Sequence, residues 1–158
     1  MTDAISRTLV ATVLGVAPDA LPPGDLPVAR LAARFLAFLT ESMAQDSDPP
    51  HPEAWTFALY GALVSDHPGL ALATLQAMTE QITRFDEAEL IASGPLDEFL
   101  NAKSAAPLLA QIDAAAKASP RFAFLLSGVS PEGSAGTPFW KTIRAIGEAA
   151  PEPDDLDG

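Results

Sequence analysis

Apolar residues recur at helical spacing along most of the chain, and prolines separate the apolar runs. The clearest run begins at Pro27 and continues to about Gln45. One side of this predicted helix carries Val28, Leu31, Phe35, Leu39 and Met43, while Arg30, Arg34 and Glu41 lie on the other side. A stripe of this width is typical of a helix that packs one face against a core.

Seven of the 15 prolines stand where such a run begins: Pro27, Pro52, Pro68, Pro95, Pro107, Pro120 and Pro138. Proline is tolerated at the first position of a helix, since its missing N–H would have no partner there, but it is disfavoured inside one. Ser119 and Thr137 directly precede two of these prolines and are typical N-cap residues. The prolines therefore predict where helices begin.

The predicted helices cover about 3–14, 27–45, 52–64, 68–82 and 86–92, followed by short helices that begin at Pro95, Pro107, Pro120 and Pro138. Helix 52–64 is apolar nearly all round, so we expect it at the centre of the core. A close helix contact would explain Gly61 within it. We expect Gly94 to end helix 86–92 in the left-handed conformation.

No segment alternates between apolar and polar β-branched residues, and alanine is abundant. The fold class predicted is all-α: a compact multi-helix bundle of about seven to nine helices. Short connections favour antiparallel neighbours, and stacked helical pairs are one way to arrange them. We divide the chain into an N-terminal helix with a Pro-rich connector (1–24), a single helical domain (25–149) and an acidic disordered tail (150–158).

Composition narrows the classes of partner. Hydrophobic residues make up 48% of the 158 residues, which fits a folded domain, and the net charge is −12. This charge disfavours nucleic acid and anionic membranes and permits a basic protein partner. Cysteine is absent and no apolar run could span a bilayer, so we expect a cytoplasmic protein. The oligomeric state stays open.

Few residues suggest chemistry. His51 and His67 have acids nearby, but no histidine pair shares a helix face, so we predict no metal site and no cofactor. Acidic residues gather between Glu80 and Glu98, and Asp86, Glu87, Glu89, Asp97 and Glu98 are candidate binding residues there. Asp97 and Glu98 also fit a first helical turn, where the helix dipole favours negative charge. Trp55 is also a candidate binding residue, although a tryptophan on an apolar helical stripe is more often a core anchor than a ligand platform.

The stretch 90–129 contains LIASGPLDEFL, PLLAQIDAAA and SPRFAFLLSGV, and residues 52–55 read PEAW. These segments resemble a family of small bacterial helical proteins without an assigned function, over roughly Leu31 to Val129. Where that family often has His-Gly, this chain has Lys103 and Ser104, and Ser130 stands in place of the family's closing tryptophan. The resemblance implies an all-α domain and supplies no activity. Lys103 is a further candidate binding residue.

Three functions follow as hypotheses. The first is a non-catalytic helical domain that binds another protein, because no catalytic motif is present. The second is an acidic inhibitor or immunity-type protein that covers a basic partner. The third is an enzyme with Asp97 or Glu98 as general base in a pocket between helices.

Overall fold

The computed structural model describes residues 4–42, 52–131 and 136–157. Its α-helices are α1 (Arg7–Leu14), α2 (Val28–Ser42), α3 (Trp55–Asp66), α4 (Pro68–Gln81), α5 (Phe85–Ile91), α6 (Asp97–Asn101), α7 (Leu109–Ala118), α8 (Pro120–Leu126) and α9 (Pro138–Ala149). The only strands described, β1 (Ala4–Ile5) and β2 (Leu26–Pro27), form one short antiparallel pair. The predicted all-α bundle is confirmed.

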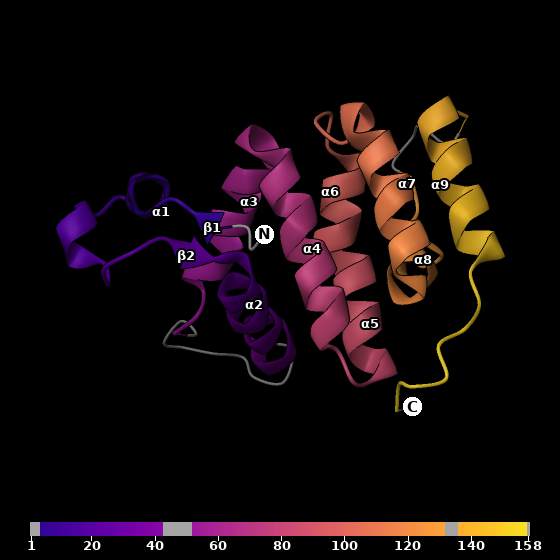
Figure 1. Ribbon diagram of the computed structural model, residues 1–158, viewed down its shortest axis with the longest axis horizontal. Helices are drawn as coiled ribbons and strands as arrows, with labels where there is room; N and C mark the ends of the chain where they lie inside the picture. The colour runs from indigo at the N-terminus through magenta and orange to yellow at the C-terminus, as the bar shows by residue number, and fades with distance from the viewer. Residues whose placement is uncertain (1–3, 43–51, 132–135, 158) are drawn as a thin grey trace.

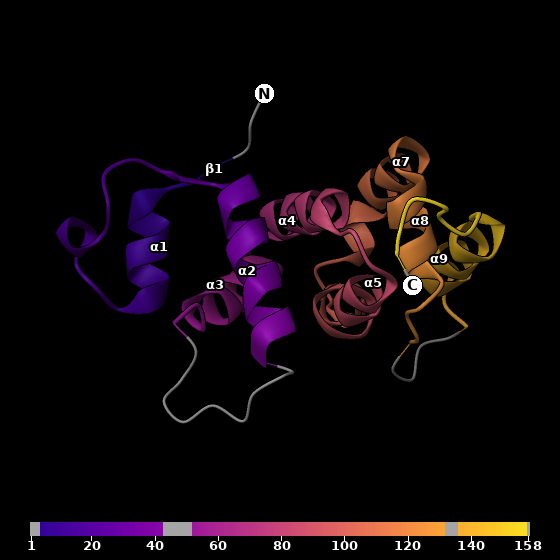
Figure 2. The same ribbon diagram turned by 90° about the horizontal axis from the view of Figure 1, so that it is seen from below.

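The helices lie side by side in a row that follows the order of the chain (Figures 1 and 2). Helix α4 is the centre of this row, because it packs against α2, α3, α5, α6 and α8. The expectation that the helix at 52–64 would be central was wrong. Phe57 of α3 is 57% exposed, so this helix has a solvent face despite its apolar composition.

Three of the seven prolines that were expected to begin helices occupy the first turn of an α-helix, namely Pro68, Pro120 and Pro138. The predicted N-caps are also confirmed: the hydroxyl of Ser119 accepts a hydrogen bond from the Phe122 amide, and that of Thr137 accepts one from the Trp140 amide. Pro27 instead ends β2 directly before α2, Pro52 lies in a turn before α3, and Pro107 lies in a 3-10 turn (η3, Ala106–Leu108) before α7.

Pro95 does not begin a helix. It lies inside a π-helical turn (η2, Ala92–Leu96) that joins α5 to α6 in one continuous rod. The glycines with positive φ among the described residues are Gly15 and Gly24, so Gly94 is not a left-handed stop. The wider π turn accommodates the proline ring, which would clash with a carbonyl in a regular α-helix. The buried Tyr60 hydroxyl donates a 2.6 Å hydrogen bond to the Pro95 carbonyl, tying this turn to α3.

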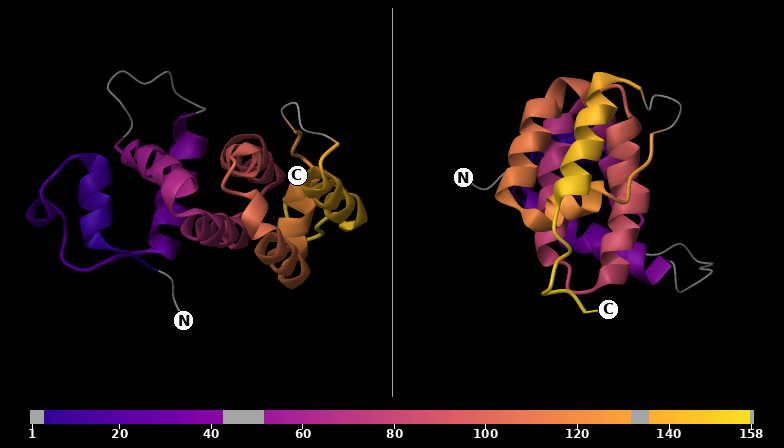
Figure 3. Two further views of the ribbon diagram at one scale, coloured as in Figure 1. Left: turned by 90° about the horizontal axis from the view of Figure 1, so that it is seen from above. Right: turned by 90° about the vertical axis from the view of Figure 1, so that its right-hand side faces the viewer.

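The C-terminal residues 151–157 differ from the expected disordered tail. They run from the end of α9 back toward α5 (Figures 1 and 3). Backbone hydrogen bonds join Asp157 to Thr83 and Phe85, both at 2.9 Å, and Leu156 is only 7% exposed. One leucine side chain that reaches the core and one short bridge to the α4–α5 turn thus give this polar segment a defined path.

The N-terminal residues fold back onto the bundle. The pairing of β1 with β2 brings the Pro-rich connector, which includes the 3-10 turn η1 (Pro18–Ala20), alongside α1. Ile5 is fully buried and α1 packs against α3. Within the described ranges, no helix combines the length and the apolar character that a membrane crossing would need.

Candidate binding clefts

The predicted acidic residues of α5 have local structural roles. The Asp86 carboxylate forms an ion pair with Arg84, whose Nε–H donates to it at 3.0 Å, and this lowers the pKa of the Asp86 carboxyl. The Glu87 carboxylate accepts hydrogen bonds from the backbone amides of Thr83 and Arg84, at 3.0 and 3.2 Å, and so caps the start of the helix. Glu89 is exposed and lines a pocket of about 480 Å³ between α5 and α8.

Asp97 and Glu98 lie more than two turns further along the same rod, about 16 Å from Asp86 at 1.5 Å per residue. The Asp97 carboxylate accepts a 3.1 Å hydrogen bond from the Asn101 amide. Glu98 is exposed but faces α3, where partial desolvation raises the pKa of its carboxyl. Neither residue lines the pocket between α5 and α8 or either of the two larger clefts among the described residues. The helix dipole does not explain this pair, because the rod continues through η2 ahead of it.

Lys103 is exposed in the turn that follows α6. His67 lies between α3 and α4, directly before Pro68, and His51 lies outside the described residues. Within the part of the chain that the structure describes, no three carboxylates or imidazoles gather closely enough to hold a metal ion. The acidic residues predicted from the sequence are therefore spread along one rod instead of forming one site.

Trp55 lies in a cleft of about 590 Å³ that opens between α1, the Pro-rich connector, α2 and the start of α3. Its indole N–H donates a 2.8 Å hydrogen bond to Glu53, which also pairs with Arg34 at 3.1 Å. Arg7 and Arg30 line the same cleft. We call this the arginine cleft, defined by Arg7, Arg30, Arg34, Glu53 and Trp55.

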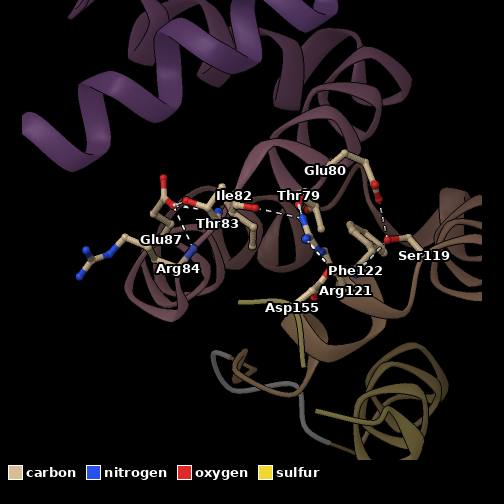
Figure 4. Close-up of polar contacts among 10 residues, drawn as sticks. All are labelled: Thr79, Glu80, Ile82, Thr83, Arg84, Glu87, Ser119, Arg121, Phe122 and Asp155. Atoms are coloured by element: carbon tan, nitrogen blue, oxygen red, sulfur yellow. Dashed lines mark hydrogen bonds and ion pairs between the residues drawn. The ribbon is translucent and has the colours of Figure 1, made fainter. Parts of the chain in front are cut away.

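A second cleft, of about 580 Å³, lies at the other end of the bundle, where the C-terminal tail crosses the end of α4 and the start of α8. We call it the acidic cleft, defined by four carboxylates and one arginine: Glu80, Glu152, Asp154, Asp155 and Arg121. The Glu80 carboxylate accepts a 2.8 Å hydrogen bond from Ser119, the N-cap of α8 (Figure 4).

Arg121 holds the acidic cleft together. Its guanidinium donates to the Ile82 and Thr79 carbonyls, at 3.0 and 3.5 Å, near the end of α4, where helix carbonyls lack partners. It also donates a 2.6 Å hydrogen bond to Asp155, which lowers the pKa of that carboxyl (Figure 4). One side chain therefore joins α4, α8 and the tail, so that the tail's acids and Glu80 line the same cleft.

Sequence reasoning missed most of these residues. Arg30 and Arg34 are four apart on one helix and so share a face, which is a readable signal. Arg7 and the tail acids offered none, because their positions depend on the β1–β2 pairing and on Leu156 reaching the core.

The comparison with protein families places the clefts in context. The model of a family of unknown function, DUF6869, matches residues 43–151. The chain belongs to this family. No curated protein and no solved structure matched the chain. The matched region covers α3 to α9 and so includes the α4 and α8 walls of the acidic cleft, whereas α1, α2 and most of the tail lie outside it.

Proposed function

We propose that this chain is a non-catalytic helical interaction domain that binds a basic segment of a protein partner in the acidic cleft. The observation that carries the proposal is the convergence of Glu80, Glu152, Asp154 and Asp155 on one concave surface. Glu80 stands near the end of α4 and the other three stand in the C-terminal tail, about 70 positions later, so the fold itself concentrates their charge.

The charge balance of the cleft supports a cationic ligand. Four carboxylates and one guanidinium give a formal charge of −3. Arg121 is already engaged by two backbone carbonyls and by Asp155, so it offsets little more than that one carboxylate. Glu152 and Asp154 are exposed and have no ion-pair partner among the described residues. They are therefore available to lysine or arginine side chains of a partner.

The walls of the cleft also suit a peptide ligand. Pro120 of α8 and Pro151 and Pro153 of the tail line it. Proline fixes the backbone dihedral φ, so the two tail prolines reduce the conformational entropy that the tail would lose on binding. The net charge of −12 would steer a basic partner toward the chain and make association depend strongly on salt.

The test is a titration of the 15N-labelled chain with a short lysine-rich peptide at low salt, followed by NMR and by calorimetry. We expect amide shifts in α4, α8 and the tail. The double variant Glu152→Gln/Asp154→Asn should bind about 5- to 30-fold more weakly, because each exposed ion pair contributes up to about 1 kcal/mol.

The matched control is Asp66→Asn/Glu148→Gln, which removes the same two charges from exposed positions outside the cleft. When the titration is repeated at about 0.1 M salt, the control should retain wild-type affinity within about twofold, because exposed charges more than about 10 Å apart are then largely screened. Equal losses in the two double variants would mean that only the net charge attracts the peptide, and this would overturn the proposal.

A narrower form of the same function is an inhibitor or immunity-type protein, whose partner is a toxin-like protein with a basic active surface. The acidic cleft supports it by the same charge complementarity. A neighbouring gene should then encode such a basic protein, and the chain should block that protein's activity. Activity that persists at saturating concentrations of the chain would exclude this narrower role.

A further inference from the structure

We propose that the arginine cleft is a second, separate binding site, and that it takes a small organic carboxylate with an apolar body. The inference does not depend on the acidic cleft, which lies at the opposite end of the bundle and shares no residue with it.

The first support is charge. The chain has nine basic residues against 21 acidic ones, yet three arginines line this one cleft. They face the carboxylates of Asp25 and Glu53, so the cleft has a formal charge of +1 in a chain of −12. Glu53 is paired with Arg34, but Arg30 is exposed and makes no ion pair with any described residue. A guanidinium that is free on the wall of a cleft is suited to a carboxylate, which it can bind through two parallel hydrogen bonds.

The second support is an unsatisfied donor. The Nη2 atom of Arg7 donates a 2.7 Å hydrogen bond to the Leu21 carbonyl, which anchors the side chain against the connector. Its Nε atom is buried and has no hydrogen-bond partner within the described residues. A buried donor without a partner is costly, and a small shift of the cleft wall around Arg7 would let a ligand oxygen accept from it and relieve this cost.

The third support is the apolar wall of the cleft, which favours a carboxylate with an apolar body over inorganic phosphate. Five lining residues supply it: Val10, Leu14, Leu21, Leu26 and Trp55. A volume of about 590 Å³ lies within the range of roughly 300–1,000 Å³ typical of small-molecule sites. The wall would cover the body of the ligand while the arginines bind its carboxylate.

The experiment titrates the full chain with phenylpropanoate, and with phenylpropanol and acetate as the analogues that lack the charge or the body. The indole N–H signal of Trp55 reports on the cleft, and that of Trp140, buried in α9, serves as the internal control. We expect phenylpropanoate to shift the Trp55 signal alone and to bind at least about tenfold more tightly than either analogue. Phenylpropanol loses the charge-assisted hydrogen bonds, and acetate loses the burial of the apolar body.

Arg30→Gln should weaken phenylpropanoate binding about tenfold or more without loss of stability, since Arg30 makes no ion pair with any described residue. Arg144→Gln, at an exposed position of α9, removes the same charge elsewhere and should change nothing. Equal binding of phenylpropanol, equal losses in the two variants, tighter binding of inorganic phosphate, or no movement of the Trp55 signal would each overturn the proposal.

Discussion

Replacing Gly147 by alanine places a methyl group where α9 crosses the end of α8. The added Cβ would lie 2.8 Å from both the Cα and the backbone nitrogen of Ser127, and 3.0 Å from the carbonyl carbon of Leu126. These neighbours are backbone atoms, which cannot rotate away as a side chain would. The two helices must therefore separate, and overpacking of this kind costs about 1–3 kcal/mol.

Alanine also improves helix propensity by up to about 1 kcal/mol relative to glycine, which offsets part of that cost. We expect Gly147→Ala to lower the free energy of unfolding by about 1–2 kcal/mol, or the melting temperature by roughly 2–8 °C for a chain of this size. Urea denaturation followed by circular dichroism measures the first value and a thermal melt the second.

Gly61→Ala is the matched control, because it makes the same substitution within α3. The nearest atom that its Cβ would meet is Glu98 Oε1 at 3.9 Å, an ordinary contact. The close helix approach expected at Gly61 is therefore absent, and this variant should be as stable as wild type or up to about 1 kcal/mol more stable. A Gly147→Ala variant that gains as much stability as Gly61→Ala would refute the packing of α9 against α8.

Three further changes test other parts of the fold. Tyr60→Phe removes the hydrogen bond to the buried Pro95 carbonyl and should cost about 1–3 kcal/mol in urea denaturation; an unchanged midpoint would mean that the π turn does not depend on α3. Partial burial raises the folded-state pKa of Glu98, so the protonated carboxyl favours the folded state in acid and this effect is lost as pH rises through that pKa. Glu98→Gln should therefore be at least as stable as wild type at pH 7, and the difference should vanish below the ordinary glutamate pKa. A variant less stable than wild type at pH 7 would contradict this sign. Ser119→Ala removes the N-cap of α8 and should cost about 0.5–2 kcal/mol, whereas Ser119→Thr should retain most of the stability.

Local signals in the sequence were sufficient for most of the helices. The requirement that a proline occupy a first turn is local, and it located the starts of α4, α8 and α9 to the residue at Pro68, Pro120 and Pro138. The hydroxyl caps before the last two are equally local, because an N-cap bonds only to amides within the next turn.

The π turn at Pro95 could not be predicted in the same way. Gly94 and Pro95 are typical of a helix stop followed by a helix start, and only the surrounding fold overrides this preference. Tyr60, 35 positions earlier in the chain, binds the Pro95 carbonyl, and Ile91 before the π turn and Phe99 after it are fully buried. Tertiary packing therefore keeps the rod continuous where the local sequence favours a break.

The acidic cleft could not be predicted from the sequence either, because it too depends on contacts between distant segments. The acidic composition of the tail and the run of acids after Glu80 were both visible, but their meeting point was not. It depends on one leucine, Leu156, in an otherwise polar segment, and on the three-way contacts of Arg121. A single apolar residue carries no periodic signal, so composition alone indicated disorder.

The central claim is that the geometry of the acidic cleft, and not merely the charge of the chain, binds a basic partner. Leu156→Ala tests it most directly, because it should release the tail from the α4–α5 turn while leaving every carboxylate and the net charge of −12 unchanged. We predict that the variant remains folded by circular dichroism, loses hydrogen-exchange protection at the Asp157 amide, and binds the lysine-rich peptide several-fold more weakly in calorimetry. Wild-type affinity in a variant whose tail is released would contradict the claim.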